Sequence, residues 1–117
     1  MHTVLGVEDD PLIALDLSET IAEATGISVV TALNLTAAEQ ALGSEITFAI
    51  LDVNLGNETT FALARLLALR GVPFVFTSGF NRIGLPEDLR ETVFLSKPCK
   101  FSEVLKAVRS GIAGYDA

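Results

Sequence analysis

Five polar side chains in this sequence could together act on a phosphoryl group. Glu8 and Asp9 directly follow a short apolar run, and Asp52 directly follows another. Carboxylate oxygens suit Mg²⁺, which commonly works beside phosphate with one or two protein carboxylates. With the ion bound, Asp52 could attack an electrophilic phosphorus as a nucleophile. Ser78 and Lys97, which follow two later apolar runs, could then hold the phosphoryl oxygens.

Three carboxylates in one place require cations beside them. Two carboxylates about 4 Å apart repel each other by about 4 kcal/mol at an effective dielectric constant of ~20. One divalent cation and one ammonium group would neutralise three such charges. The only histidine, His2, and the only cysteine, Cys99, are far apart in the sequence and do not form a zinc-binding spacing. The expected metal is therefore Mg²⁺ rather than a soft ion.

The elements that must position these residues follow from the apolar pattern. Helix-like runs alternate with strand-like runs, which indicates about five βα units. Parallel strands need crossover helices, and right-handed crossovers place helices on both faces of the sheet. The predicted fold is a doubly wound α/β domain with a five-stranded parallel sheet in three layers. The strands are expected at residues 4–7, 27–32, 47–51, 72–76 and 93–95.

Helix boundaries are predicted from capping residues. The first helix should begin at Pro11, with Asp10 well placed as its N-cap, and should stop at Gly26. Thr36 and Glu39 have the spacing of a capping box that opens the second helix. The remaining helices are expected over residues 60–70, as a short or irregular helix over 81–90, and after a cap by Ser102 near the C-terminus.

The fold gives a reason for the five polar residues to meet. In open α/β sheets, ligands bind beyond the carboxyl ends of the strands, where the strand order reverses. Glu8 and Asp9 follow the first predicted strand, and Asp52 follows the third. Ser78 follows the fourth and Lys97 the fifth, so all five are expected at one edge of the sheet.

Composition narrows the class of protein. The chain has 117 residues, half of them hydrophobic, and a net charge of −7, which fits one globular domain and opposes direct binding to nucleic acid. No Lys or Arg precedes Arg65, whereas ten acidic residues do. A single cysteine and the absence of a long apolar run predict a protein of the reducing cytoplasm without a membrane span.

Taken together, and in this order, the motifs resemble a bacterial response-regulator receiver domain, the phosphoacceptor module of two-component signalling. The resemblance rests on Glu8-Asp9, Asp52, Ser78-Gly79 and Lys97-Pro98, each after its apolar strand, and covers essentially the whole chain. It implies a flavodoxin-like sheet of order 2-1-3-4-5 and one receiver domain over residues 1–117 without an output domain. The segment 76–80 is similar to a box found in stand-alone receivers.

The resemblance also implies roles for individual residues. Asp52 would accept a phosphoryl group from a sensor histidine kinase or a phosphotransfer protein, and the chain would signal to a downstream protein target. Mg²⁺ would be held by three carboxylates and one backbone carbonyl, those of Glu8, Asp9, Asp52 and Asn54. Ser78 and Lys97 would sense the phosphoryl group, and Phe94 would be the switch aromatic. Such a domain assists its own phosphorylation and dephosphorylation and is otherwise not an enzyme. The Lys97-Pro98 bond is expected to be cis.

The sequence departs from the family pattern near the expected site. Leu55-Gly56 and Thr59-Thr60 replace the common Met-Pro and Asp-Gly, and Cys99 replaces the common Phe. An unusual partner-binding face is therefore expected, and a receiver-like binding module that is not phosphorylated remains an alternative. A phosphohydrolase of the haloacid-dehalogenase type would need a second Asp two positions after Asp52, where Asn54 stands. A flavodoxin relative would need a Gly-rich phosphate loop after the first strand.

Overall fold

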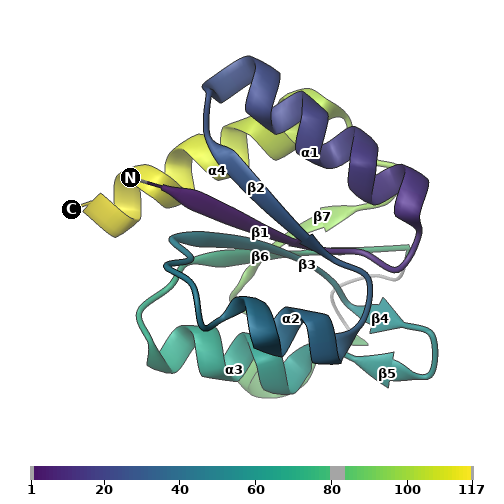
Figure 1. Ribbon diagram of the computed structural model, residues 1–117. Helices are drawn as coiled ribbons and strands as arrows, with labels where there is room; N and C mark the ends of the chain where they lie inside the picture. The colour runs from purple at the N-terminus through teal and green to yellow at the C-terminus, as the bar shows by residue number, and fades with distance from the viewer. Residues whose placement is uncertain (1, 80–83, 117) are drawn as a thin grey trace.

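The computed structural model describes residues 2–79 and 84–116. Figure 1 shows its helices and strands. In chain order the elements are β1 (Thr3–Val7), α1 (Pro11–Thr25), β2 (Ser28–Ala32), α2 (Leu35–Ala41), β3 (Phe48–Asp52), β4 (Asn54–Leu55), β5 (Glu58–Thr59), α3 (Phe61–Leu69), β6 (Phe74–Ser78), the 3₁₀ turn η2 (Glu87–Leu89), β7 (Val93–Ser96) and α4 (Phe101–Asp116).

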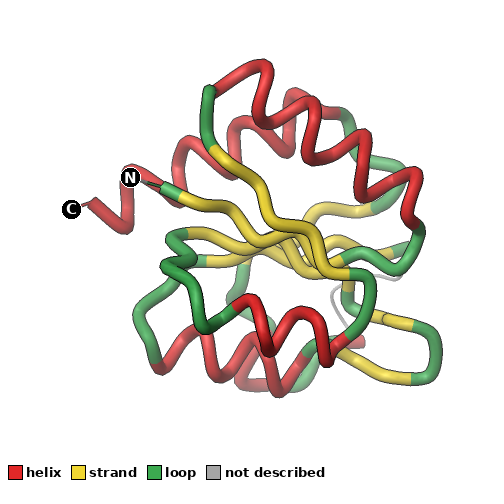
Figure 2. Tube along the Cα trace, viewed as in Figure 1, coloured by secondary structure: helices red, strands yellow, loops and turns green. Residues whose placement is uncertain are grey.

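The main sheet has five parallel strands in the order β2-β1-β3-β6-β7. This is the predicted order 2-1-3-4-5 when the strands of this sheet are counted along the chain. Helices α1 and α4 cover one face of the sheet and α2 and α3 the other, as Figure 1 and Figure 2 show. The predicted three-layer α/β fold is confirmed.

The strand β3 lies at the centre of the sheet and is buried along its whole length. Successive side chains of a strand point to opposite faces, so a strand covered on both sides must be apolar throughout. Ala49 and Leu51 pack in the cluster that includes residues of α2 and α3. Phe48 and Ile50 pack in the cluster that includes residues of α1 and α4. The two clusters hold both helical layers on the sheet.

Capping of α1 agrees with the sequence prediction. Pro11 occupies its first turn, and the carboxylate of Asp10 accepts hydrogen bonds from the amides of Leu12 (2.9 Å) and Ile13 (3.4 Å). Gly26 ends the helix with φ of 71°, a left-handed conformation that favours glycine. The first helix therefore begins and ends where the sequence predicts.

Two predicted helix starts were wrong. Asn34 caps α2, because its side-chain oxygen accepts a hydrogen bond from the amide of Ala37 at 2.8 Å, and Thr36 lies inside the helix. An Asn that precedes a helix competes well for the N-cap position, and here it lies two residues before the Thr. The last helix begins at Phe101, so Ser102 lies in its first turn.

The described part of the connection between β6 and β7 contains the 3₁₀ turn η2 and no α-helix, which agrees with the predicted short or irregular helix. Residues 80–83, including Phe80 of the stand-alone box, lie outside the described residues. Leu85 and Leu89 are buried in the core. The guanidinium group of Arg65 in α3 forms two hydrogen bonds, of 2.8 and 3.1 Å, with the carboxylate of Asp88. Buried leucines and this ion pair hold the connection against α3.

A short antiparallel hairpin, β4–β5, follows β3 and was not predicted. Its turn contains Gly56 with φ of 60°. Within the described part of the chain, no helix has the length and apolar character needed to cross a membrane.

Candidate functional site

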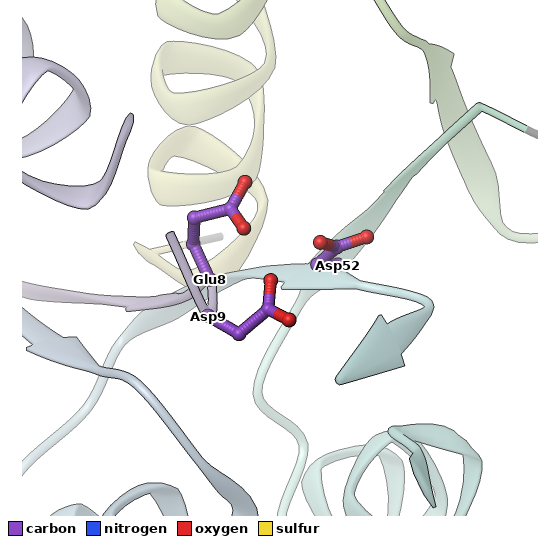
Figure 3. Close-up of side chains that lie close together, drawn as sticks. All are labelled: Glu8, Asp9 and Asp52. Carbon is purple, nitrogen blue, oxygen red and sulfur yellow. The ribbon is translucent and has the colours of Figure 1, made fainter. Parts of the chain in front are cut away.

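Three carboxylates meet at one edge of the sheet. Asp52 is the last residue of β3, and Glu8 and Asp9 follow the last residue of β1. Because β1 and β3 are neighbouring parallel strands with Val7 opposite Leu51, their carboxyl ends lie together. One oxygen of each carboxylate lies within 4.8 Å of an oxygen of the other two, and Figure 3 shows the three side chains together. The predicted convergence is confirmed.

Lys97 connects two of these carboxylates. Its ammonium nitrogen lies 2.8 Å from Oε1 of Glu8 and 3.0 Å from Oδ2 of Asp52. The Lys97 side chain is 31% exposed, whereas those of Glu8 and Asp52 are only 6% and 11% exposed. An ammonium group from the second half of the chain therefore lies among the acids of the first half. The Lys97-Pro98 peptide is cis, as expected.

Burial and charge act against each other in this cluster. Burial raises the pKa of Glu8, and the ammonium group of Lys97 and the amide of Asp10 oppose that rise without cancelling it. Burial alone would lower the pKa of Lys97, but its hydrogen bonds to Glu8 and Asp52 outweigh this, so the pKa of Lys97 is raised. Lys97 thus carries its charge at neutral pH.

The donor set fits a hard dication. Three carboxylates and one ammonium group leave two negative charges uncompensated when all the groups are ionised. The cluster offers carboxylate oxygens as ligands, which suit Mg²⁺ better than a soft metal. Asp9 is exposed, so an ion can reach the cluster from solvent.

The other predicted site residues lie on the next strands of the sheet. Ser78 is the buried last residue of β6, and its carbonyl accepts a hydrogen bond of 2.8 Å from the backbone amide of Lys97. Asn54 begins the hairpin two residues after Asp52. Phe94 in β7 is partly buried. Ser78, Asn54 and Phe94 line one cavity of about 620 Å³, whose lining also includes Val53, the residue after Asp52.

One residue of this region was missed by sequence reasoning. The hydroxyl of Thr60 donates a hydrogen bond of 2.9 Å to the backbone carbonyl of Asp52, and Thr60 is completely buried. A Thr before an apolar helix is typical of an N-cap, and the sequence holds no signal for a contact eight residues back. In the sequence, Thr60 stands out only as a departure from the family pattern.

An apolar groove of about 480 Å³ adjoins the site between α1 and α4. Its apolar lining includes Ile13, Leu17, Phe101 and Val104. Glu8 and Lys97 line the same groove, so it opens beside the carboxylates.

No protein-family model and no curated protein sequence matches the chain. Solved structures do. The solution structure of SdrG from Sphingomonas melonis Fr1 is 32% identical, with 100% of this chain and 98% of that chain covered and a TM-score of 0.74. The chemotaxis protein CheY4 of Vibrio cholerae is 25% identical, with 95% and 98% covered and a TM-score of 0.78.

A third similar structure is the response regulator protein TrrA from Thermotoga maritima in complex with Mg²⁺-BeF. It is 19% identical, with 94% of this chain and 98% of that chain covered and a TM-score of 0.80, which shows a shared fold. Fold, strand order and identity over nearly the full length of both chains agree, and this chain belongs to the response-regulator receiver family.

Proposed function

We propose that this receiver domain accepts a phosphoryl group on Asp52 from a phosphohistidine of a sensor histidine kinase or a phosphotransfer protein. The observation that carries the proposal is the position of Lys97, whose ammonium group lies within 3.0 Å of both Glu8 and Asp52 while Asp9 completes the cluster. A buried carboxylate beside a fixed cation is suited to receive a group that brings its own negative charge.

The same proposal includes Mg²⁺. The carboxylates of Glu8, Asp9 and Asp52 would hold it, together with the backbone carbonyl of Asn54, and the ion would neutralise charge on the phosphoryl oxygens. The donor chemistry of the cluster supports this, as does the presence of Mg²⁺-BeF in the complex of TrrA, a protein of the same fold.

The transfer needs few protein groups. An Oδ atom of Asp52 forms the new bond to phosphorus while the bond from phosphorus to the imidazole nitrogen breaks, and its electron pair stays on that nitrogen. Lys97, already 3.0 Å from Asp52 Oδ2, would pair with a phosphoryl oxygen. The Ser78 hydroxyl would donate to another phosphoryl oxygen from the end of the neighbouring strand β6.

Signalling would follow from a shift between two conformations. Ser78 would move towards the phosphoryl group, and Phe94 would change its rotamer in the cavity that both residues line. The face formed by η2, β7 and α4 would then bind a downstream protein. We place the chain in the cytoplasm, because the proposed kinase domain and the proposed downstream target would operate there.

Labelling tests the proposal. Acetyl phosphate with Mg²⁺ should label the wild-type chain, detected as a mass increase of the intact protein, and EDTA should prevent it. Asp52→Asn should stay unlabelled, while Asp16→Asn, at an exposed acid of α1, should label normally. Labelling of Asp52→Asn at the wild-type level would refute the role of Asp52.

The alternative is a binding module that keeps the receiver fold and is not phosphorylated. The specific observation in its favour is the β4–β5 hairpin directly after Asp52, in a segment that departs from the family pattern. Titration with Mg²⁺, followed by NMR, separates the two. Shifts confined to the amides near Glu8, Asp9 and Asp52 support the phosphoacceptor, and unchanged spectra support the binding module.

A further inference from the structure

Thr60 directly precedes α3 but does not act as an ordinary helix cap. In the N-cap position a Thr hydroxyl usually accepts a hydrogen bond from one of the first free amides of the helix. Among the described residues, the Thr60 side chain caps none of the α3 amides. Its hydroxyl instead donates a hydrogen bond of 2.9 Å to the carbonyl of Asp52, eight residues earlier in the chain.

A second bond from the same residue reaches the next peptide unit. The backbone amide of Thr60 donates to the carbonyl of Val53 at 3.0 Å, and the amide of Val53 donates to the carbonyl of Thr77 in β6, also at 3.0 Å. Thr60 therefore holds two successive carbonyls, those of Asp52 and Val53. Fixing both fixes the peptide planes on either side of Val53, and with them the direction in which the chain leaves β3.

Both of these peptide planes bear on the proposed magnesium site. The first belongs to Asp52, whose carboxylate is one of the proposed ligands. The second leads into Asn54, whose carbonyl is another. Thr60 is completely buried, so water cannot readily replace its hydroxyl at the Asp52 carbonyl. A carbonyl left without this partner in an apolar interior would favour a different backbone angle.

We infer that Thr60 is a positioning residue of the phosphoacceptor site, because it fixes the backbone of Asp52 and Val53 and so sets the placement of the Asp52 carboxylate and the Asn54 carbonyl. The inference rests on the proposed function. It concerns a position at which this sequence departs from the family pattern, in which a glycine is common. A glycine could offer its amide to Val53 but has no hydroxyl for Asp52.

The test compares variants that keep or remove the hydroxyl. Thr60→Val has nearly the same shape without the hydroxyl, and Thr60→Ser keeps the hydroxyl. Thr59→Val is a control at the exposed neighbouring position in β5. For the full chain, the dissociation constant of Mg²⁺ is measured by NMR titration, and amide hydrogen exchange at residue 60 is measured without metal. Urea unfolding of each variant reports its overall stability.

The expected result is that Thr60→Val binds Mg²⁺ about tenfold more weakly, as is usual when a group that orients a metal ligand is lost. Exchange at residue 60 should be faster in this variant. Thr60→Ser and Thr59→Val should stay within about threefold of the wild-type dissociation constant. Rescue by Ser is the result that a merely structural role would not give, since Ser also loses the buried methyl group.

Two results would overturn the inference. In one, Thr60→Val binds Mg²⁺ as the wild type does; in the other, Thr60→Ser loses as much affinity as Thr60→Val. A wild-type chain that neither binds Mg²⁺ nor becomes labelled would refute the proposed function instead, and the role at the metal site would fall with it. The second claim, that Thr60 anchors the backbone, is tested separately. It would be refuted if the amide of residue 60 exchanged at the same rate in Thr60→Val as in the wild type.

Discussion

Replacement of Lys97 by methionine is the perturbation that tests the carboxylate cluster most directly. Methionine keeps a long unbranched side chain but removes the ammonium group that lies 2.8 Å from Glu8 and 3.0 Å from Asp52. Glu8 and Asp52 then keep their burial and lose their shared cation. Without metal, Lys97→Met should therefore lower the free energy of unfolding.

The magnitude follows from the burial of the three groups. Removal of one partner from a fully buried ion pair costs about 3–5 kcal/mol, and from an exposed pair at most about 1 kcal/mol. The two carboxylates are nearly buried, but the Lys97 side chain is 31% exposed, so water screens part of the attraction. An intermediate loss of about 2 kcal/mol is expected. For a domain of this size, that is a decrease in Tm of about 8 °C.

The loss should depend on pH. Burial raises the pKa of Glu8 in the folded chain, and Lys97 opposes that rise, so Lys97→Met should raise this pKa further. A raised carboxyl pKa means that the folded state holds the proton more tightly than the unfolded state does. Ionised Glu8 therefore lowers the free energy of unfolding. This decrease is complete above the pKa of Glu8 in the folded chain and vanishes below its unfolded value of 4.5. The difference between variant and wild type should therefore be largest at neutral pH and shrink as the pH falls.

Urea unfolding in EDTA, repeated over this pH range, measures the difference, and added Mg²⁺ should stabilise Lys97→Met more than the wild type. Lys100→Met is the matched control, because Lys100 is exposed and lies three residues further along the chain. If Lys97→Met unfolds at the same urea concentration as Lys100→Met at neutral pH without metal, Lys97 is not the cation that stabilises Glu8 and Asp52.

Two further predictions concern the α4 side of the sheet. A Cβ atom on Gly111 would overlap the ring of Phe48, so Gly111→Ala should lose about 1–3 kcal/mol in urea unfolding. Gly114→Ala is the control, because a Cβ atom on Gly114 would meet open space, and its free energy of unfolding should not decrease. Equal decreases in both variants would contradict the close packing of α4 on the sheet. Burial, with the nearby carboxylate of Glu103, raises the pKa of the Cys99 thiol, so alkylation of the folded chain should increase with a midpoint above 9.0. A midpoint below that value would contradict the burial of the thiol, and Glu103→Gln should lower the midpoint.

The sheet and the carboxylate cluster could be predicted because both depend on features that a sequence displays. Apolar strands alternate with helices, and parallel strands end at a common edge, so residues that follow strands must converge there. Glu8, Asp9, Asp52 and Lys97 all follow this rule. The structure confirms that they meet. Their roles in magnesium binding and phosphoryl transfer stay predictions.

The cap of α2 and the β4–β5 hairpin could not be predicted, because each depends on a choice between local conformations of nearly equal free energy. Asn34 and Thr36 can both cap a helix, and only the backbone of the folded chain shows that Asn34 does so. The β4–β5 strands have two residues each, which is too short for any alternation of apolar and polar residues. Gly56-Asn57 is a turn signal, but without flanking periodicity it does not predict a hairpin.

Variation around this site follows from what its chemistry requires. Phosphoryl acceptance needs charges of given sign at given positions, so the proposed chemistry allows little change in Glu8, Asp9, Asp52 and Lys97. The segment after Asp52 only has to hold the end of β3 in place, and different side chains can do so. Here a hydroxyl from Thr60 holds the Asp52 carbonyl, and the hairpin closes beside it. The departure from the family pattern thus lies in how the proposed nucleophile, Asp52, is supported, while the charged groups themselves are kept.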